Sequence, residues 1–163
     1  MNADAPAILI ALEQSGFAMA LRQSVWAYPT ANVAHIVTLV VFAAAVAVMD
    51  LRLLGAFSAT EPAKVVIPAQ RVAIAALALQ AASGLMLFAA EASHVSLNPV
   101  FLTKAGLIAL GIVNALAVQG AMTRALASTP ASAPLPARVR VAAVASMVVW
   151  LSVAAAGRLI AYF

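Results

Sequence analysis

His35 is the residue best suited to chemistry, because it is a histidine inside a long apolar stretch. An imidazole can act as a buried hydrogen-bonding group, as a ligand of haem b or another metal centre, or as a proton- or ligand-binding group. Tyr28 and Asn32 lie seven and three residues before it, which places the three side chains on one face of a helix. The sequence leaves these three roles open.

Three further ionisable residues are expected at the same membrane end as His35, each on a different apolar segment: Glu91, Lys104 and Arg158. A charged side chain facing lipid at mid-membrane costs at least ~2.5 kcal/mol, so such residues usually face the bundle interior or a water-filled cavity. We therefore predict a polar ligand pocket lined by Tyr28, Asn32, His35, Glu91, Lys104 and Arg158. Lys104 and Arg158 are also near enough to their span ends to reach lipid headgroups instead.

Small residues indicate which helix faces approach one another. Gln80, Gly84 and Glu91 follow one helical stripe, and Lys104 and Gly111 follow another. Glycine lets two membrane helices approach closely, so these stripes are expected to face the interior of the bundle.

A second polar cluster is expected at the opposite membrane end, where Asp50, Arg52 and Arg71 lie close to the ends of two spans. An ion pair between Asp50 and Arg71 would clamp the first span to the second. We interpret this cluster as structural.

The composition indicates a membrane protein that forms one domain over residues 1–163. Of these residues 66% are hydrophobic and only 9% are charged, whereas a soluble domain of this length needs far more polar surface. The net charge of +4 comes from basic residues spread along the chain, which fits contact with a lipid bilayer and not with nucleic acid. The chain has no cysteine, which excludes disulfides and thiolate metal sites.

Hydropathy and helix-terminal signals predict an all-α fold, a bundle of four transmembrane helices preceded by an amphipathic helix. The amphipathic helix is expected over residues 5–23. The four spans are expected at about 29–54, 69–92, 98–125 and 138–162. His35 then lies about 9 Å inside the first span, at 1.5 Å of rise per residue.

The distribution of basic residues predicts the orientation. Two of the loops between spans carry three basic residues each: Arg52, Lys64, Arg71 and Arg124, Arg138, Arg140. Because Lys and Arg accumulate on the cytoplasmic side, both termini are expected on the periplasmic side.

The motifs of common enzymes are absent. The sequence has no HExxH, no Gly-x-Ser-x-Gly and no phosphate-binding loop, which favours a protein that is not an enzyme. With two histidines in all, His35 and His94, the chain can supply both axial ligands of at most one haem. Its methionines are scattered, unlike those of copper carriers.

Several segments resemble a family of uncharacterised bacterial four-span inner-membrane proteins, which is loosely similar to the copper-resistance D type membrane proteins. The segments are Ser24-Val-Trp26-Ala-Tyr28-Pro29, Asp50-Leu-Arg52-Leu-Leu-Gly55, Asn98-Pro-Val-Phe101-Leu-Thr-Lys104 and Gly157-Arg158-Leu-Ile-Ala-Tyr162. The resemblance covers nearly the whole chain and implies a location in the bacterial inner membrane. It implies no activity.

The leading hypothesis is a membrane protein whose periplasm-facing pocket binds a small ligand or a partner. One alternative is a redox subunit that uses His35 with haem b or a quinone. Another is a structural subunit, whose partners would be a second copy of the chain or a different membrane subunit.

Overall fold

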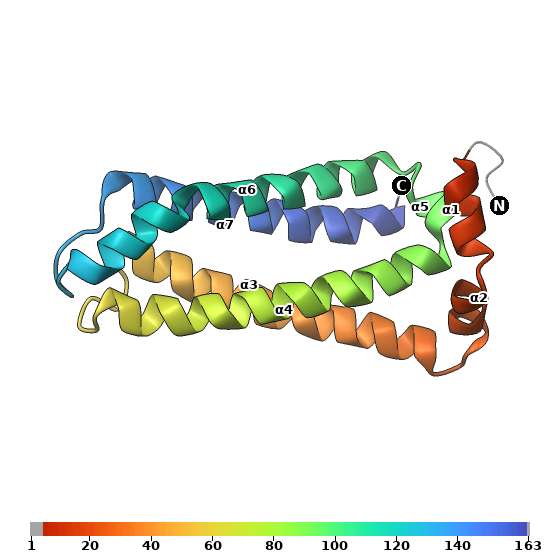
Figure 1. Ribbon diagram of the computed structural model, residues 1–163, viewed down its shortest axis with the longest axis horizontal. Helices are drawn as coiled ribbons and strands as arrows, with labels where there is room; N and C mark the ends of the chain where they lie inside the picture. The colour runs from red at the N-terminus through yellow and green to blue at the C-terminus, as the bar shows by residue number, and fades with distance from the viewer. Residues whose placement is uncertain (1–4, 163) are drawn as a thin grey trace.

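The architecture is a bundle of long helices, seen in a computed structural model that describes residues 5–162. Four helices run along the long axis of the molecule (Figure 1): α3 (Ala27–Leu54), α4 (Pro62–Ala90), α6 (Pro99–Ser128) and α7 (Ala137–Leu159). Each is long and apolar enough to cross a membrane. The described residues contain no strand, so the predicted all-α class with four candidate spans is confirmed.

Two helix boundaries follow directly from local sequence. Asn98 is the N-cap of α6, where its side-chain oxygen accepts hydrogen bonds from the backbone N–H groups of Val100 and Phe101 at 2.9 and 3.2 Å. At the other boundary α3 ends at Leu54, and its C-cap is Gly55, whose φ of 114° is left-handed and suits a residue without a side chain.

The second span begins earlier than the expected residue 69. Pro62 opens α4 in its first turn, where a proline needs no N–H partner, and Pro68 is accommodated inside the helix. The segment between the two prolines is therefore part of the span and not of the loop.

The N-terminal region also differs from the single helix expected over residues 5–23. It forms two helices, α1 (Ala7–Glu13) and α2 (Gly16–Gln23). The break occurs at Ser15, whose hydroxyl accepts a hydrogen bond from the Ala18 N–H at 3.2 Å and so starts a new helix.

The long helices pack as two hairpins joined along one seam. Helix α3 packs extensively against α4, α6 packs against α7, and the hairpins meet mainly through α3 and α7. At this seam the rings of Phe42 and Trp150 form an edge-to-face pair with centroids 4.6 Å apart. Helices α4 and α6 contact each other little.

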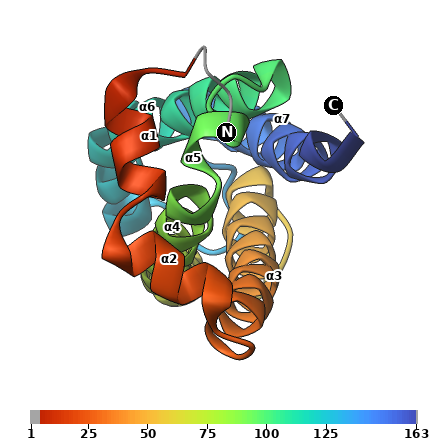
Figure 2. The same ribbon diagram turned by 90° about the vertical axis from the view of Figure 1, so that its right-hand side faces the viewer.

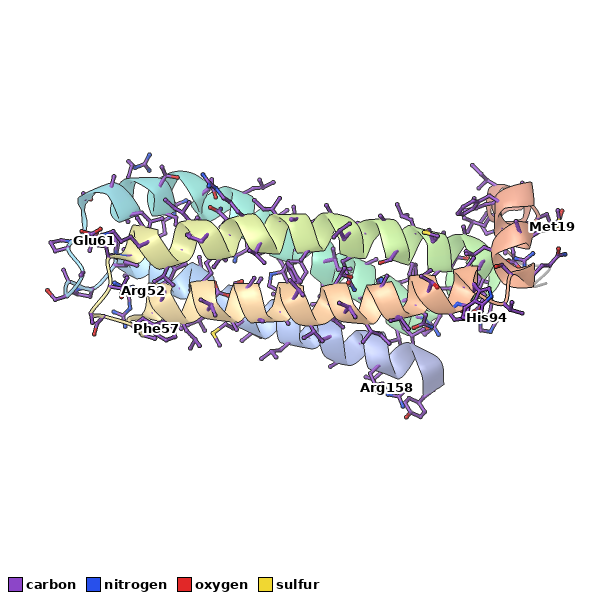
Figure 3. The ribbon with its side chains drawn as sticks, turned by 90° about the horizontal axis from the view of Figure 1, so that it is seen from below. Met19, Arg52, Phe57, Glu61, His94 and Arg158 are labelled. Atoms are coloured by element: carbon purple, nitrogen blue, oxygen red, sulfur yellow. The ribbon has the colours of Figure 1, made fainter. Side chains whose placement is uncertain are left out.

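The short helices gather at one end of the bundle. In Figure 2 α1 and α2 lie across that end, beside the short helix α5 (Ala92–Val95) that follows α4. A short 3₁₀ helix, η1 (Ile160–Tyr162), continues α7. Figure 3 places Met19, His94 and Arg158 at this end, and Arg52, Phe57 and Glu61 at the other. We call these the cap end and the turn end.

Candidate functional site

His35 is half-buried between α3 and α4, and both of its ring nitrogens have partners on α4. Its Nδ1 lies 2.9 Å from the Ser83 hydroxyl, and its Nε2 lies 2.9 Å from the amide nitrogen of Gln80. The Thr38 hydroxyl donates to the carbonyl oxygen of the same Gln80 side chain. The amide nitrogen must then donate to Nε2, which makes the imidazole neutral with its proton on Nδ1.

This network changes the interpretation of His35. Haem iron binds a histidine through a ring nitrogen that is free to coordinate, and here Gln80 and Ser83 use both. The residues therefore do not fit a haem ligated by His35 in this arrangement. The described residues also contain no group of three or more His, Cys, Asp or Glu side chains that could hold a metal ion.

Close packing holds the imidazole in place. A Cβ atom built on Gly84 would lie 3.0 Å from Cε1 of His35, so the ring rests on the bare backbone of α4. Gln80 and Gly84, which share the stripe seen in the sequence, therefore do face His35. The predicted pocket does not include Ser83, although a serine three residues from Gln80 in an alanine-rich span is a sequence signal for a polar contact.

Lys104 lies near His35 but belongs to the other hairpin. Its side chain is half-buried and close enough to act electrostatically on His35. Its Nζ lies 3.3 Å from the position that a Cβ on Gly157 of α7 would occupy. The ion pair among the described residues is Lys64–Glu61, which lies on the surface. Lys104 forms neither an ion pair nor a hydrogen bond with any described residue.

The other expected pocket residues have different partners. The Tyr28 hydroxyl donates to Glu91 Oε1 at 3.2 Å, in an exposed contact near the cap. Asn32 is exposed. Arg158 is also exposed and points away from the other helices (Figure 3). It donates to the Tyr162 hydroxyl at 2.6 Å, and its guanidinium lies 4.7 Å from the centre of that ring.

Helices α1 and α2, which we call the cap, are held by two charged residues that the sequence analysis did not assign to a site. Arg22 donates to the Ala90 carbonyl at the end of α4 at 2.6 Å, and to the Glu13 carbonyl at 2.9 Å. The Glu13 carboxylate accepts from the Ser93 N–H in the first turn of α5 at 2.8 Å. A cation at a helix C-terminus and an anion at an N-terminus both satisfy backbone groups that the helices leave unpaired.

Hydrogen bonding to Ser93 lowers the pKa of the Glu13 carboxyl below its ordinary value, and the nearby Arg22 charge acts in the same direction. The carboxylate that fastens the cap is therefore ionised at neutral pH.

The cluster expected at the turn end is only partly assembled. Asp50 and Arg52 are buried, but Arg71 is exposed and makes no ion pair with Asp50 within residues 5–162. Arg52 instead donates to the carbonyls of Thr60 and Ala131 at 2.7 and 3.1 Å. It thereby ties the α3–α4 turn to the α6–α7 link, whereas the expected Asp50–Arg71 pair would clamp the first span to the second.

Comparison with known proteins gives a family and no activity. A family model described as "Family of unknown function (DUF6644)" matches residues 15–163. This confirms the resemblance to an uncharacterised family. No curated protein matches the chain, and no solved structure does.

Proposed function

We propose that this chain, which belongs to the family of unknown function DUF6644, is a multi-pass membrane protein that binds a small anionic or carbonyl-bearing molecule beside Lys104. The observation that carries the proposal is a half-buried ammonium group inside a candidate span with no counter-charge among the described residues. An ionisable side chain in such a place is expensive and usually has a function.

The surroundings of Lys104 suit a ligand that accepts hydrogen bonds. Its ammonium group has three N–H donors, and a charge-assisted hydrogen bond from it to a carboxylate, phosphate or quinone oxygen would be about twice as strong as a neutral one. Gly157 has no side chain, which lets Nζ of Lys104 lie close to the backbone of α7. His35 contributes a neutral, fixed wall in this scheme, because both of its nitrogens are already used.

The orientation belongs to the same proposal. Basic residues crowd the turn end, so by the charge rule this end faces the cytoplasm of a bacterium and the cap end faces the periplasm. Both termini are then periplasmic, and the Lys104 site lies in the outer half of the inner membrane. Helices α1 and α2, fastened by Arg22 and Glu13, cover the periplasmic end.

The test is to identify molecules that remain with the protein during purification. Wild type, Lys104→Met, Lys104→Arg and Arg158→Met would be expressed in a bacterium and purified in parallel in one mild detergent. Small molecules would be extracted and counted per chain by mass spectrometry. Arg158→Met is the matched control. It removes a cation from the same membrane end, but one that is bound to Tyr162.

Wild type and Arg158→Met are expected to retain one acidic or carbonyl-bearing molecule per chain, and Lys104→Met to lose it. A charged hydrogen bond of about 1.5–3 kcal/mol corresponds to about 10- to 150-fold in affinity. Lys104→Arg should retain part of the ligand. A folded wild type with no such molecule, or equal retention in Lys104→Met, would overturn the proposal.

A further inference from the structure

A cavity of about 50 Å³ lies between the long helices near the turn end, and its lining on α6 begins at Asn114, ten residues after Lys104. All four long helices contribute to its wall. Most of the lining is aliphatic, but five polar residues also line it: Asp50, Gln70, Asn114, Gln119 and Ser146.

Asp50 is the acidic residue of this cavity, and it forms no ion pair with the other described residues. The residue is 1% exposed, and its Oδ2 atom has no hydrogen-bond partner within residues 5–162. The Ser146 hydroxyl of α7 hydrogen-bonds to the carboxyl group. The nearest basic residue along the chain, Arg52, is bound to the carbonyls of Thr60 and Ala131. Among the described residues that line the cavity, none is a lysine or an arginine.

The neighbouring amides leave oxygen atoms unused. The Asn114 amide nitrogen donates to the Ala142 carbonyl at 3.0 Å, and the Gln70 amide nitrogen donates to Gln119 Oε1 at 2.9 Å. Within residues 5–162 the side-chain oxygens of Asn114 and Gln70 accept no hydrogen bond. The cavity thus offers carboxylate, hydroxyl and amide oxygens from four helices, the ligands that hard cations prefer.

We propose that Asp50, Gln70, Asn114 and Ser146 form a binding site for a small monovalent metal cation, with Na⁺ as its representative. One carboxylate balances one positive charge, whereas Mg²⁺ and Ca²⁺ sites commonly use several carboxylates or retain many waters. A water molecule needs about 10–15 Å³ of cavity volume, so the cavity of about 50 Å³ has room for an ion with one or two waters. This site is separate from Lys104 and goes beyond the function proposed above.

The experiment measures thermal unfolding of the full chain in nanodiscs of zwitterionic lipid. Sodium chloride replaces choline chloride at constant ionic strength, so that only the identity of the cation changes. Binding to the folded state raises the Tm by mass action. At a Na⁺ concentration of about ten times the Kd, the ratio of folded to unfolded protein rises about eleven-fold. For a chain of this size, this raises the Tm by about 3–6 °C.

Asp50→Asn is expected to abolish the Na⁺ response. The matched control is Glu61→Gln, because Glu61 is an exposed carboxylate at the same end of the bundle (Figure 3) and should leave the response unchanged. Ser146→Ala and Gln70→Leu keep the carboxylate and remove one oxygen each, so they should weaken the response. They also keep the test decisive if Asp50→Asn does not fold.

Direct binding of ²²Na⁺ to the purified wild type should give one ion per chain and be lost together with the Tm response. Equal Tm values in Na⁺ and choline over a full titration would overturn the proposal, since Asp50 would then be buried in its protonated form. A response that is undiminished in Asp50→Asn, Ser146→Ala and Gln70→Leu would overturn it as well.

Discussion

Gln80 of α4 and His35 of α3 lie with their side-chain nitrogens 2.9 Å apart, and this hydrogen bond fixes the register of the two helices in the half of the first hairpin nearer the cap end. Because the Gln80 carbonyl is in turn bound to Thr38, the amide is held from both sides. A polar group in a membrane interior that is held so completely fixes one relative position of two helices.

We expect His35 and Gln80 to be energetically coupled. In a double-mutant cycle with His35→Leu and Gln80→Leu, the coupling should be about 0.6 kcal/mol, the average for polar contacts between membrane helices, with an upper limit of about 1.7 kcal/mol. The measurement is reversible unfolding in detergent. Strict additivity of the two single changes would show that the hydrogen bond contributes nothing.

Gly106 and Gly111, five residues apart on α6, should respond differently to replacement by alanine. A Cβ at Gly111 would lie 2.8 Å from the Trp150 ring, whereas nothing lies within 4 Å of one at Gly106. Gly106→Ala should stabilise the protein by up to about 1 kcal/mol through helix propensity. The stability of Gly111→Ala should lie about 1–3 kcal/mol below that of Gly106→Ala, because the added methyl group overpacks the contact with Trp150. The two Tm values test this, and equal values would contradict the close packing of α6 against α7 at Trp150.

The cap should loosen when Arg22 is replaced. Arg22→Gln removes the charged donor that reaches the Ala90 carbonyl, so amide hydrogen exchange across α1 and α2 should accelerate. Helices α3 and α7 should keep their protection, because their packing does not involve this residue. Gln23→Ala, an exposed change in the same turn, is the control. Unchanged exchange in Arg22→Gln would mean that apolar contacts of α2 alone hold the cap.

The Glu13 contact predicts a dependence of stability on pH. Since the folded-state pKa of Glu13 lies below its ordinary value of 4.5, the ionised carboxylate stabilises the folded state above that value. This contribution is lost as the pH falls from about 4.5 through the lower folded-state pKa. The Tm difference between wild type and Glu13→Gln should therefore be constant near neutral pH and shrink below about pH 4.5. A difference that grows on acidification would contradict this assignment.

Depth along a helix was predictable from the sequence, but the direction of a side chain around the helix was only partly so. The Asn98 N-cap and the Gly55 C-cap fixed two helix ends, and the hydropathy of the spans fixed the number of long helices. Counting residues from these ends put Arg158 at the level of His35, yet Arg158 turns outward to Tyr162. Which of two residues at equal depth faces inward depends on how the hairpins pack, and one sequence does not carry that information.

The same reason explains the residues at the turn end. Asp50 and Arg71 lie on adjacent helices near one membrane surface, so an ion pair was a reasonable expectation. The orientation of α4 about its own axis exposes Arg71, so Asp50 is buried without an Arg71 partner. Arg52 instead donates to two backbone carbonyls that are more than 70 residues apart in the chain. Likewise, the cap contacts of Glu13 and Arg22 depend on the break at Ser15, which turns one amphipathic segment into two short helices.

The two-hairpin packing has a consequence for biosynthesis. Ribosomes deliver the chain from its N-terminal side, so α3 and α4 reach the membrane before α6 and α7. Because the His35, Gln80 and Ser83 hydrogen bonds all lie within the first hairpin, they can form without waiting for the rest of the chain. The Phe42–Trp150 pair and the surroundings of Lys104 must wait until α7 has been made. The arrangement of these contacts thus permits assembly in two stages, with the hydrogen bonds of His35 complete in the first.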